Sequence, residues 1–253
     1  MSIVLNETKY AEYILEKGEV GNKPTSTLFL LGKYYRQKKQ LGKEDTIKKL
    51  NNFMDQNYKN YNPALWEDVI EDISKKAKKY TLREIDSIGI TRSELDNISK
   101  LCNIKYEKLL FTMLCYAKLY NMISETINGW VNTDIRKLYK AARITVKYRN
   151  DKFLFLNDIE RTGLISFSNK NDNLNLKVNF IDMGDEIVLK ITDFRELGYE
   201  YMNYIGNGYF VRCSECNRLI KKKNKYDHST KYCSECARLI KNEQNKKYYK
   251  NKI

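Results

Sequence analysis

Residues 213–221 of the 253-residue chain read Cys-Ser-Glu-Cys-Asn-Arg-Leu-Ile-Lys, and residues 233–241 repeat this stretch as Cys-Ser-Glu-Cys-Ala-Arg-Leu-Ile-Lys. Each copy opens with a pair of cysteines, so the four cysteines follow the pattern C-x2-C-x16-C-x2-C: Cys213, Cys216, Cys233 and Cys236. Two cysteines at this spacing on a tight turn direct both sulfur atoms at one point, and four thiolates suit tetrahedral zinc. The spacing therefore predicts one structural zinc ion, held by two turns related by approximate two-fold symmetry.

A site with four sulfur ligands leaves no open coordination position, so the metal is expected to stabilise structure and not to catalyse hydrolysis. Disulfides or unligated thiols are the alternatives, and disulfides suit small secreted domains. Residues 1–16 contain no apolar core of a secretory signal, which favours a cytoplasmic protein. Cys102 and Cys115 stand in apolar helical contexts and are expected to be small core residues. His228 is the only histidine; it could replace a metal ligand or lie at the surface.

The formal net charge of +14 is concentrated near the cysteines. Residues 212–253 contain 13 Lys and Arg against 4 Asp and Glu, a difference of +9 that leaves +5 for the other 211 residues. A dense positive field attracts polyanions, and binding to phosphates then weakens steeply with salt. The charge predicts a nucleic-acid partner, with DNA as the leading candidate and RNA as an alternative.

The N-terminal half repeats apolar residues with the period of a helix between recognisable caps. Gly18 and Asn62 mark a helix end and a helix start, and Thr91 with Glu94 forms a capping box. The expected helices are 7–17, 26–39, 43–58, 63–79, 92–101 and 104–123. We predict a helical N-terminal region over residues 1–103, whose role the sequence leaves open.

The pattern changes after Gly129. A short strand at 130–131 precedes a helix capped by Asn132 that runs to about residue 142, and a second helix, capped by Asn150 or Asp151, runs to residue 162. A strand at 164–168, a turn at 169–173 and a strand at 174–180 follow, with a further strand at 186–191 and a helix at 193–204. Gly206 and Gly208 mark a hinge into the cysteine-rich segment.

The order helix, short strand, helix, helix, hairpin over residues 104–182 resembles winged-helix DNA-binding domains, and the cysteine-rich end resembles a zinc ribbon. The first resemblance implies a recognition helix at 150–162 and a wing tip at 169–173. As a whole, the chain resembles uncharacterised proteins of phages and mobile elements in low-GC Gram-positive bacteria. We expect a mainly α protein with a small β component, divided into residues 1–103, a winged-helix-like domain 104–205, and a zinc ribbon with a basic tail, 206–253.

The candidate nucleic-acid contacts fall into two groups. The winged-helix-like region supplies Arg136, Lys137, Lys140, Arg143, Lys147 and Arg149. The cysteine-rich loop and tail supply Lys221, Lys222, Lys223, Lys225, Lys231, Lys246 and Lys247. Lysine predominates in the second group, which favours phosphate attraction over base reading. Asp158 and Glu160 lie in the expected recognition helix, where phosphates would repel them, so a structural or protein-docking role for the middle domain stays open.

Motifs for nucleotide binding and for zinc proteases are missing from the sequence, which predicts a protein that is not an enzyme. A magnesium-dependent nuclease using Asp182, Asp185 and Glu186 is an alternative, although solvated turn acids are more common. No apolar stretch approaches the roughly 18 residues of a membrane span. The leading prediction is a zinc-stabilised DNA-binding protein that acts in transcription regulation or organises replication or recombination. The main alternative is an adaptor that binds a host or phage protein such as a polymerase; the oligomeric state is open.

Overall fold

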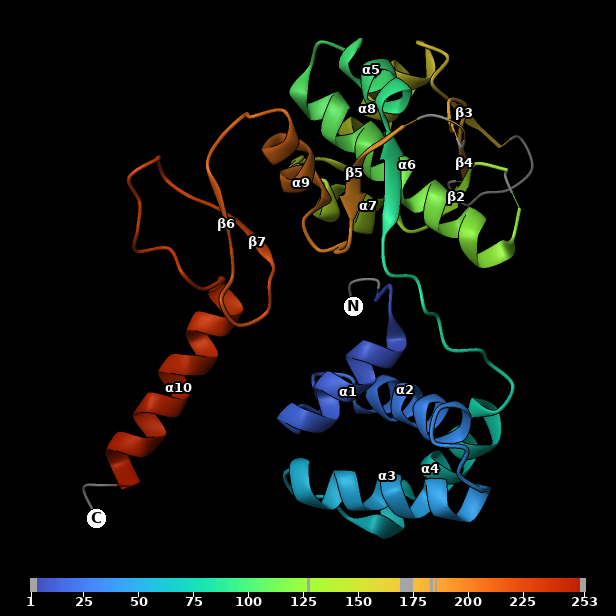
Figure 1. Ribbon diagram of the computed structural model, residues 1–253, viewed down its shortest axis with the longest axis vertical. Helices are drawn as coiled ribbons and strands as arrows, with labels where there is room; N and C mark the ends of the chain where they lie inside the picture. Colours follow the sequence, from blue (N-terminus) through green and yellow to red (C-terminus); the bar gives the residue numbers. More distant parts are fainter. Residues whose placement is uncertain (1–3, 127, 169–174, 183, 185, 251–253) are drawn as a thin grey trace. The chain divides into compact units, whose positions relative to one another are not determined.

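The computed structural model describes the chain except residues 1–3, 127, 169–174, 183, 185 and 251–253 (Figure 1). The described elements are mainly helices with small two- and three-stranded sheets, which confirms the expected mainly α class. The chain divides into two compact units, one of residues Val4–Asp86 and one that contains Ser87–Ile253. The sequence placed this boundary later, after residue 103; the pairing of residues 88–91 described below accounts for the difference.

The unit Val4–Asp86 is a small helical bundle. Its helices are α1 (Glu7–Lys17), α2 (Pro24–Gln37), α3 (Lys43–Asn57) and α4 (Pro63–Ala77). The side chain of Asn62 accepts the backbone N–H of Ala64 at the start of α4, and Gly18, with a φ of 63°, ends α1, as the sequence predicts. Fully buried apolar side chains from α2, α3 and α4 form the core: Leu28, Leu31, Leu50, Met54 and Ile70.

The first and last residues of this helical unit pair with each other. The backbone N–H of Glu7 donates to the carbonyl of Arg83 (2.8 Å), and that of Ile85 donates to the carbonyl of Leu5 (3.2 Å). The Glu7 carboxylate also binds the buried Lys33 ammonium and, at 3.2 Å, the Arg83 guanidinium. The two cations hold the pKa of Glu7 below its ordinary value although burial acts in the opposite direction.

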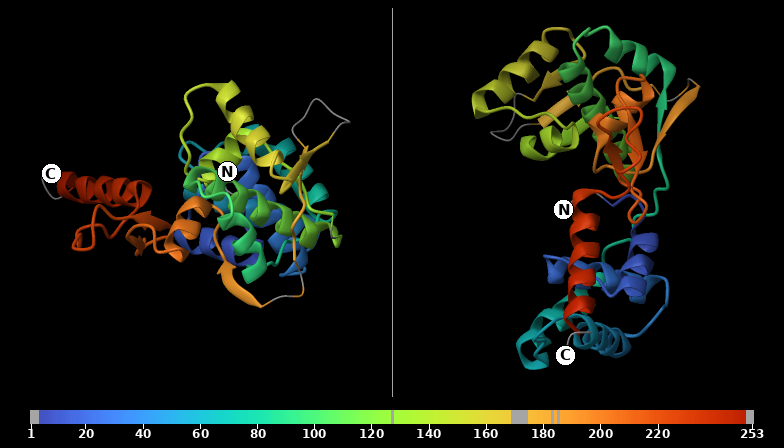
Figure 2. Two further views of the ribbon diagram at one scale, coloured as in Figure 1. Left: turned by 90° about the horizontal axis from the view of Figure 1, so that it is seen from above. Right: turned by 90° about the vertical axis from the view of Figure 1, so that its left-hand side faces the viewer.

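The second unit is built around α6 (Ile104–Ser124). Most of the side chains along α6 are buried, including Leu110, Phe111, Met113 and Leu114, each with no exposed surface. Around α6 pack α5 (Arg92–Ser99), α7 (Ile135–Ala141), α8 (Arg149–Glu160) and α9 (Leu197–Tyr204), as Figure 1 and Figure 2 show. A helix buried on most sides is apolar around most of its circumference, as residues 109–119 are apart from Thr112 and Lys118.

Two small sheets lie against this helical core. In the three-stranded sheet, β4 (Asn175–Val178) lies between β2 (Trp130–Asn132) and β3 (Ile165–Phe167), and both pairings are antiparallel. In the other, β1 (Ile88–Thr91) pairs with β5 (Ile187–Ile191). Because β1 and α5 pack within this unit, residues 87–103 belong to it. The expected turn at 169–173 lies outside the described residues.

Two predicted helix caps are wrong. Asn132 lies in β2, and α7 is instead capped by Asp134, whose carboxylate accepts the N–H of Arg136 at 2.7 Å. Helix α8 begins at Arg149, so Asn150 lies inside the helix, and no side chain caps it. In contrast, the capping box of Thr91 is confirmed.

The capping-box glutamate has a second role in the core. Glu94 is fully buried, and both of its carboxylate oxygens accept from the Lys118 ammonium at 2.8 Å. Backbone N–H groups of Thr91 and Asp182 also donate to it, at 2.8 and 3.0 Å. A buried ion pair is tolerated when its hydrogen-bonding capacity is used in this way.

Candidate metal centre

The first cysteine pair lies in a hairpin and the second at the start of a helix. Strands β6 (Phe210–Arg212) and β7 (Leu219–Lys221) pair antiparallel, with Cys213 and Cys216 in their connection. Cys233 precedes α10 (Ser234–Lys250), and Cys236 lies in its first turn. Figure 2 shows α10, in red, continuing from this hairpin region as one uninterrupted helix.

The two copies of the repeat share one turn and then diverge. In each, the residue after the cysteine pair donates its N–H to the carbonyl of the first cysteine, at 2.9 Å for both Asn217 and Ala237. Asn217 then adopts a left-handed conformation (φ 56°), and the chain reverses into β7, whereas Ala237 continues α10. These are the residues at which the copies differ, and asparagine tolerates the left-handed region while alanine favours helix. The predicted two-fold symmetry therefore extends over this turn but not beyond it.

The four sulfur atoms converge. The Sγ atoms of Cys213, Cys216, Cys233 and Cys236 all lie within 4.8 Å of one another, and the Cys216 and Cys233 sulfurs are 3.7 Å apart. A disulfide requires about 2.05 Å. Zinc–sulfur bonds of about 2.3 Å in a tetrahedron place the sulfurs about 3.8 Å apart. The donor set therefore fits a metal such as zinc, and the described residues contain no other comparable cluster of His, Cys, Asp or Glu.

Backbone donors prepare part of the cluster for a metal ion. The N–H of Cys233 donates to the Cys213 sulfur at 3.3 Å. Burial opposes ionisation of Cys213, but N–H groups of Cys233, Cys216 and Glu215 outweigh it and lower the pKa of that thiol to about 6. Burial raises the pKa of the Cys216 and Cys236 thiols, so a metal ion binding there must displace their protons.

Arginines link the cysteine cluster to α10 and to the segment that precedes α9. Arg195 donates to the backbone carbonyl of Cys216 at 2.6 Å and pairs with Asp193 at 2.7 Å. Arg218, in the hairpin, pairs with Glu235 of α10 at 2.8 Å and lies 3.9 Å from Glu196. The turn that carries Cys213 and Cys216 is thereby linked both to α10 and to residues 193–196 before α9.

Two buried carboxylates of the α9 region bind two further arginines. Glu196 is 2% exposed and binds Arg143, and Glu200 is 7% exposed and pairs with Arg212 at 2.7 Å. Burial raises the pKa of Glu200 despite the Arg212 charge. Sequence reasoning missed both acids. The available signal was their four-residue spacing within the expected helix 193–204, which would place them on one helical face.

The predicted lysines of the cysteine-rich segment surround the loop between the two pairs. Lys221, Lys223, Lys225 and Lys231 are exposed, and the Lys222 ammonium donates to the Lys225 carbonyl at 3.3 Å. Lys246 and Lys247 belong to α10, but their side chains lie outside the described part of the structure. Asp227 is the only acid in residues 217–232, so this loop is strongly positive.

Several predicted cations of the middle region contact side chains of the protein itself. Arg136 pairs with Asp134 at 3.0 Å, and Arg143 is engaged by Glu196. The Lys147 ammonium lies 5.1 Å from the centre of the Tyr148 ring. Lys137 and Lys140 are exposed on α7, and the Arg149 side chain lies outside the described residues.

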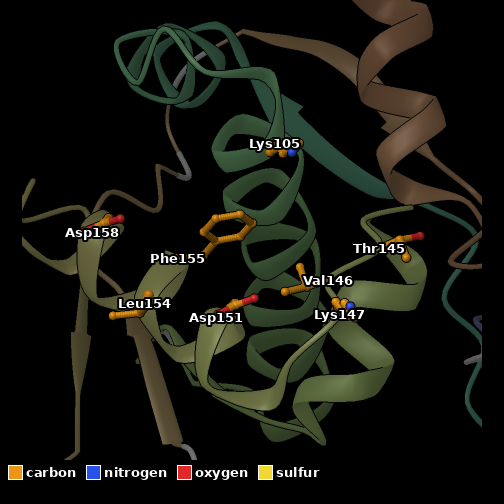
Figure 3. Close-up of a pocket in the computed structure, with 8 residues that line it drawn as sticks. All are labelled: Lys105, Thr145, Val146, Lys147, Asp151, Leu154, Phe155 and Asp158. Carbon is orange, nitrogen blue, oxygen red and sulfur yellow. The ribbon is translucent and has the colours of Figure 1, made fainter.

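An open pocket of about 400 Å³ adjoins α8 (Figure 3). Its wall comes from the start of α6, the connection before α8, and α8 itself: Lys105, Thr145, Val146, Lys147, Asp151, Leu154, Phe155 and Asp158. Leu154 is 57% exposed, and Asp158 accepts the Tyr106 hydroxyl at 2.8 Å. The surface of α8 beside this pocket is therefore apolar and acidic.

The remaining candidate residues are dispersed. The Asp182 carboxylate accepts from Ser93 (2.6 Å) and from the N–H of Gly184 (2.9 Å), and Asp185 lies outside the described residues. His228 is exposed. Cys115 is buried as expected, whereas the expectation that Cys102 is a core residue is wrong, because its left-handed backbone follows the end of α5 and leaves it exposed.

No protein-family model matches the chain, and neither a curated protein nor a solved structure matches it. Among the described helices, none combines the length and apolar character that crossing a membrane would require.

Proposed function

We propose that the protein is a zinc-stabilised DNA-binding protein that acts in transcription regulation or in organising replication or recombination. The observation that carries this proposal is the metal module, by which we mean residues 206–253. Its four converging sulfurs hold a loop with five lysines, Lys221, Lys222, Lys223, Lys225 and Lys231, on a segment whose formal charge is +9 over residues 212–253. The positive electrostatic field of such a small module favours binding to the phosphate backbone of nucleic acids.

Zinc supports this function by fixing the loop. The lysines lie between the two cysteine pairs, so both ends of the loop are tied to the same cluster. Without the metal, the four cysteines could not hold the two pairs together, since metal binding supplies the folding free energy of such small modules.

The order of helices and strands in the middle of the chain also supports DNA binding. Helices α7 and α8 lie between β2 and β3 in the chain, and β4 pairs with both strands. This order is the one expected for a winged-helix-like domain, with α8 in the recognition position. Because α8 presents Asp151, Leu154 and Asp158 beside the pocket, we assign most of the phosphate attraction to the metal module.

A salt titration of DNA affinity tests the proposal. Each phosphate contact contributes about −0.9 to the slope of log affinity against log salt on duplex DNA, so five lysine contacts give about −4.5. Replacing Lys221, Lys222, Lys223 and Lys225 by glutamine should make the slope shallower by about 3.6.

A matched control removes the same charge from the helical unit. Replacing the exposed lysines Lys49, Lys59, Lys78 and Lys79 by glutamine should leave the slope unchanged. Absence of binding at about 50 mM salt, or an equal effect of the two variants, would reject the proposal.

An adaptor is the second candidate function, and the pocket beside α8 favours it. Although Lys105 and Lys147 also line this pocket, the part formed by α8 is apolar and acidic, which suits a protein segment with basic and apolar side chains. Leu154→Asp should then abolish a partner complex that survives nuclease treatment, while DNA affinity stays unchanged. A complex that nuclease dissolves would argue against this function.

A further inference from the structure

Three tyrosines are exposed around the basic loop of the metal module. Tyr226 is 80% exposed, Tyr209 is 49% exposed and Tyr232 is 39% exposed. The N–H of Lys222 donates to the carbonyl of Tyr209 at 2.7 Å, which places an aromatic residue and a lysine opposite each other at the open end of the hairpin. Tyr226 itself lies between Lys225 and Asp227, near the middle of the loop between the two cysteine pairs.

The loop that carries Tyr226 is held by local hydrogen bonds. The Asp227 carboxylate accepts from the hydroxyls of Ser229 (2.8 Å) and Thr230 (2.7 Å) and from the N–H groups of both residues (3.1 and 3.2 Å). The Asn224 side chain accepts the N–H of Tyr226 at 2.9 Å. Such a loop is organised before a ligand arrives, which lowers the entropic cost of binding.

The same hydrogen bonds give the acid of this loop a structural role. Asp227 is the only acid in residues 217–232, and both of its oxygens are engaged by the loop itself. Its oxygens are therefore occupied by donors of the loop, while the neighbouring lysines Lys223 and Lys225 remain exposed. An exposed aromatic ring in a loop that carries several lysines is a combination that binds unpaired bases and their phosphates together.

We propose that this loop binds single-stranded DNA, with an unpaired base stacked on Tyr226 and the adjoining phosphates held by the loop lysines. The inference rests on the proposed DNA-binding function and specifies its substrate. Bases in a duplex are stacked on each other and cannot cover a tyrosine ring, whereas a single strand exposes them. Lysines bind phosphates without reading base edges, so we expect little sequence preference.

Affinity measurements on the full-length, zinc-loaded protein test the inference. The probes are a labelled 20-nucleotide DNA strand without self-complementarity, the duplex of the same sequence and the corresponding RNA strand. Tyr226→Ala should weaken single-strand binding by roughly tenfold, because one stacked base contributes that order of affinity, and should change duplex binding less than twofold. Tyr226→Phe keeps the ring and should bind the strand like the unmodified protein.

Control variants separate stacking from disruption of the fold. Tyr80→Ala removes another exposed tyrosine (57%) from the helical unit and should have no effect on any probe. The zinc content of Tyr226→Ala should equal that of the unmodified protein. A Phe variant as weak as the Ala variant would exclude stacking, and tighter binding of the RNA strand would overturn the assignment to DNA.

The outcomes also distinguish this inference from the function on which it rests. If the protein binds duplex with steep salt dependence but Tyr226→Ala leaves single-strand affinity unchanged, only the stacking inference fails. If the protein binds neither probe at about 50 mM salt, the proposed function fails as well.

Discussion

Replacing Asn217 by alanine should weaken zinc binding, because the left-handed conformation of this residue turns the chain from the first cysteine pair into β7. Asn217 has a φ of 56°, and its side chain is exposed, so the substitution removes little packing. Alanine in the left-handed region costs about 1–2 kcal/mol, a cost that asparagine largely avoids. Since the hairpin must keep this conformation to bring Cys213 and Cys216 to the cluster, the cost is expected to appear in metal affinity.

The expected change follows from that cost. At about 1.4 kcal/mol for each tenfold change in affinity, Asn217→Ala should raise the apparent zinc dissociation constant by roughly fivefold to thirtyfold. Asn217→Gly, which is free to adopt the left-handed region, should stay within about threefold of the unmodified protein. In the second copy the requirement is helical, so Ala237→Gly should cost about 1 kcal/mol.

Competition against a chromophoric chelator at fixed pH measures these dissociation constants, and cobalt substitution reports whether four thiolates still bind. The comparison between Ala and Gly at position 217 decides the argument. Equal affinities for Asn217→Ala and Asn217→Gly would show that the left-handed conformation does not limit metal binding, and the account of the divergent repeats would be refuted.

Two further predictions concern the metal and the helical unit. Cys213→Ser and Cys233→Ser should each release zinc and unfold the metal module, as measured by elemental analysis and hydrogen exchange; full zinc content in both variants would reject the site. The folded-state pKa of Glu7 is lowered, so its stabilisation is complete above the unfolded-state value, taken as 4.5, and is lost as the pH falls through the folded-state value. Glu7→Gln should therefore cost about 3 kcal/mol at pH 7, with a difference from the unmodified protein that shrinks as the pH falls below 4.5, measured as exchange protection of α1 and α2; a pH-independent difference would contradict this reasoning.

The features predicted correctly from the sequence depend on interactions between residues that are close in the chain. Asn62, Gly18 and the capping box of Thr91 and Glu94 act on backbone groups at most four residues away, so their effects can be read locally. The cysteine spacing likewise identified four side chains whose sulfurs converge. The prediction for the N-cap of α7 was wrong because asparagine and aspartate can both cap a helix, and Asn132 belongs to β2 while Asp134 caps α7.

The features missed depend on residues distant in sequence. The strand Ile88–Thr91 is short, and its extended conformation is stabilised by β5, which follows much later in the chain. Glu196 and Glu200 look like ordinary surface acids until the arginines of the metal module and of the α7 end are placed beside them. The contrast between the two repeats could have been read from Asn217 and Ala237, but the near identity of the copies suggested equal structures.

The pairing of Leu5 and Glu7 with Ile85 and Arg83 means that the chain enters and leaves the helical unit at one place. A segment with adjacent ends can be transplanted into another protein, or exchanged for a different domain, with little distortion of what flanks it. Residues 4–86 are therefore suited to replacement as a whole, while the rest of the chain keeps its own architecture.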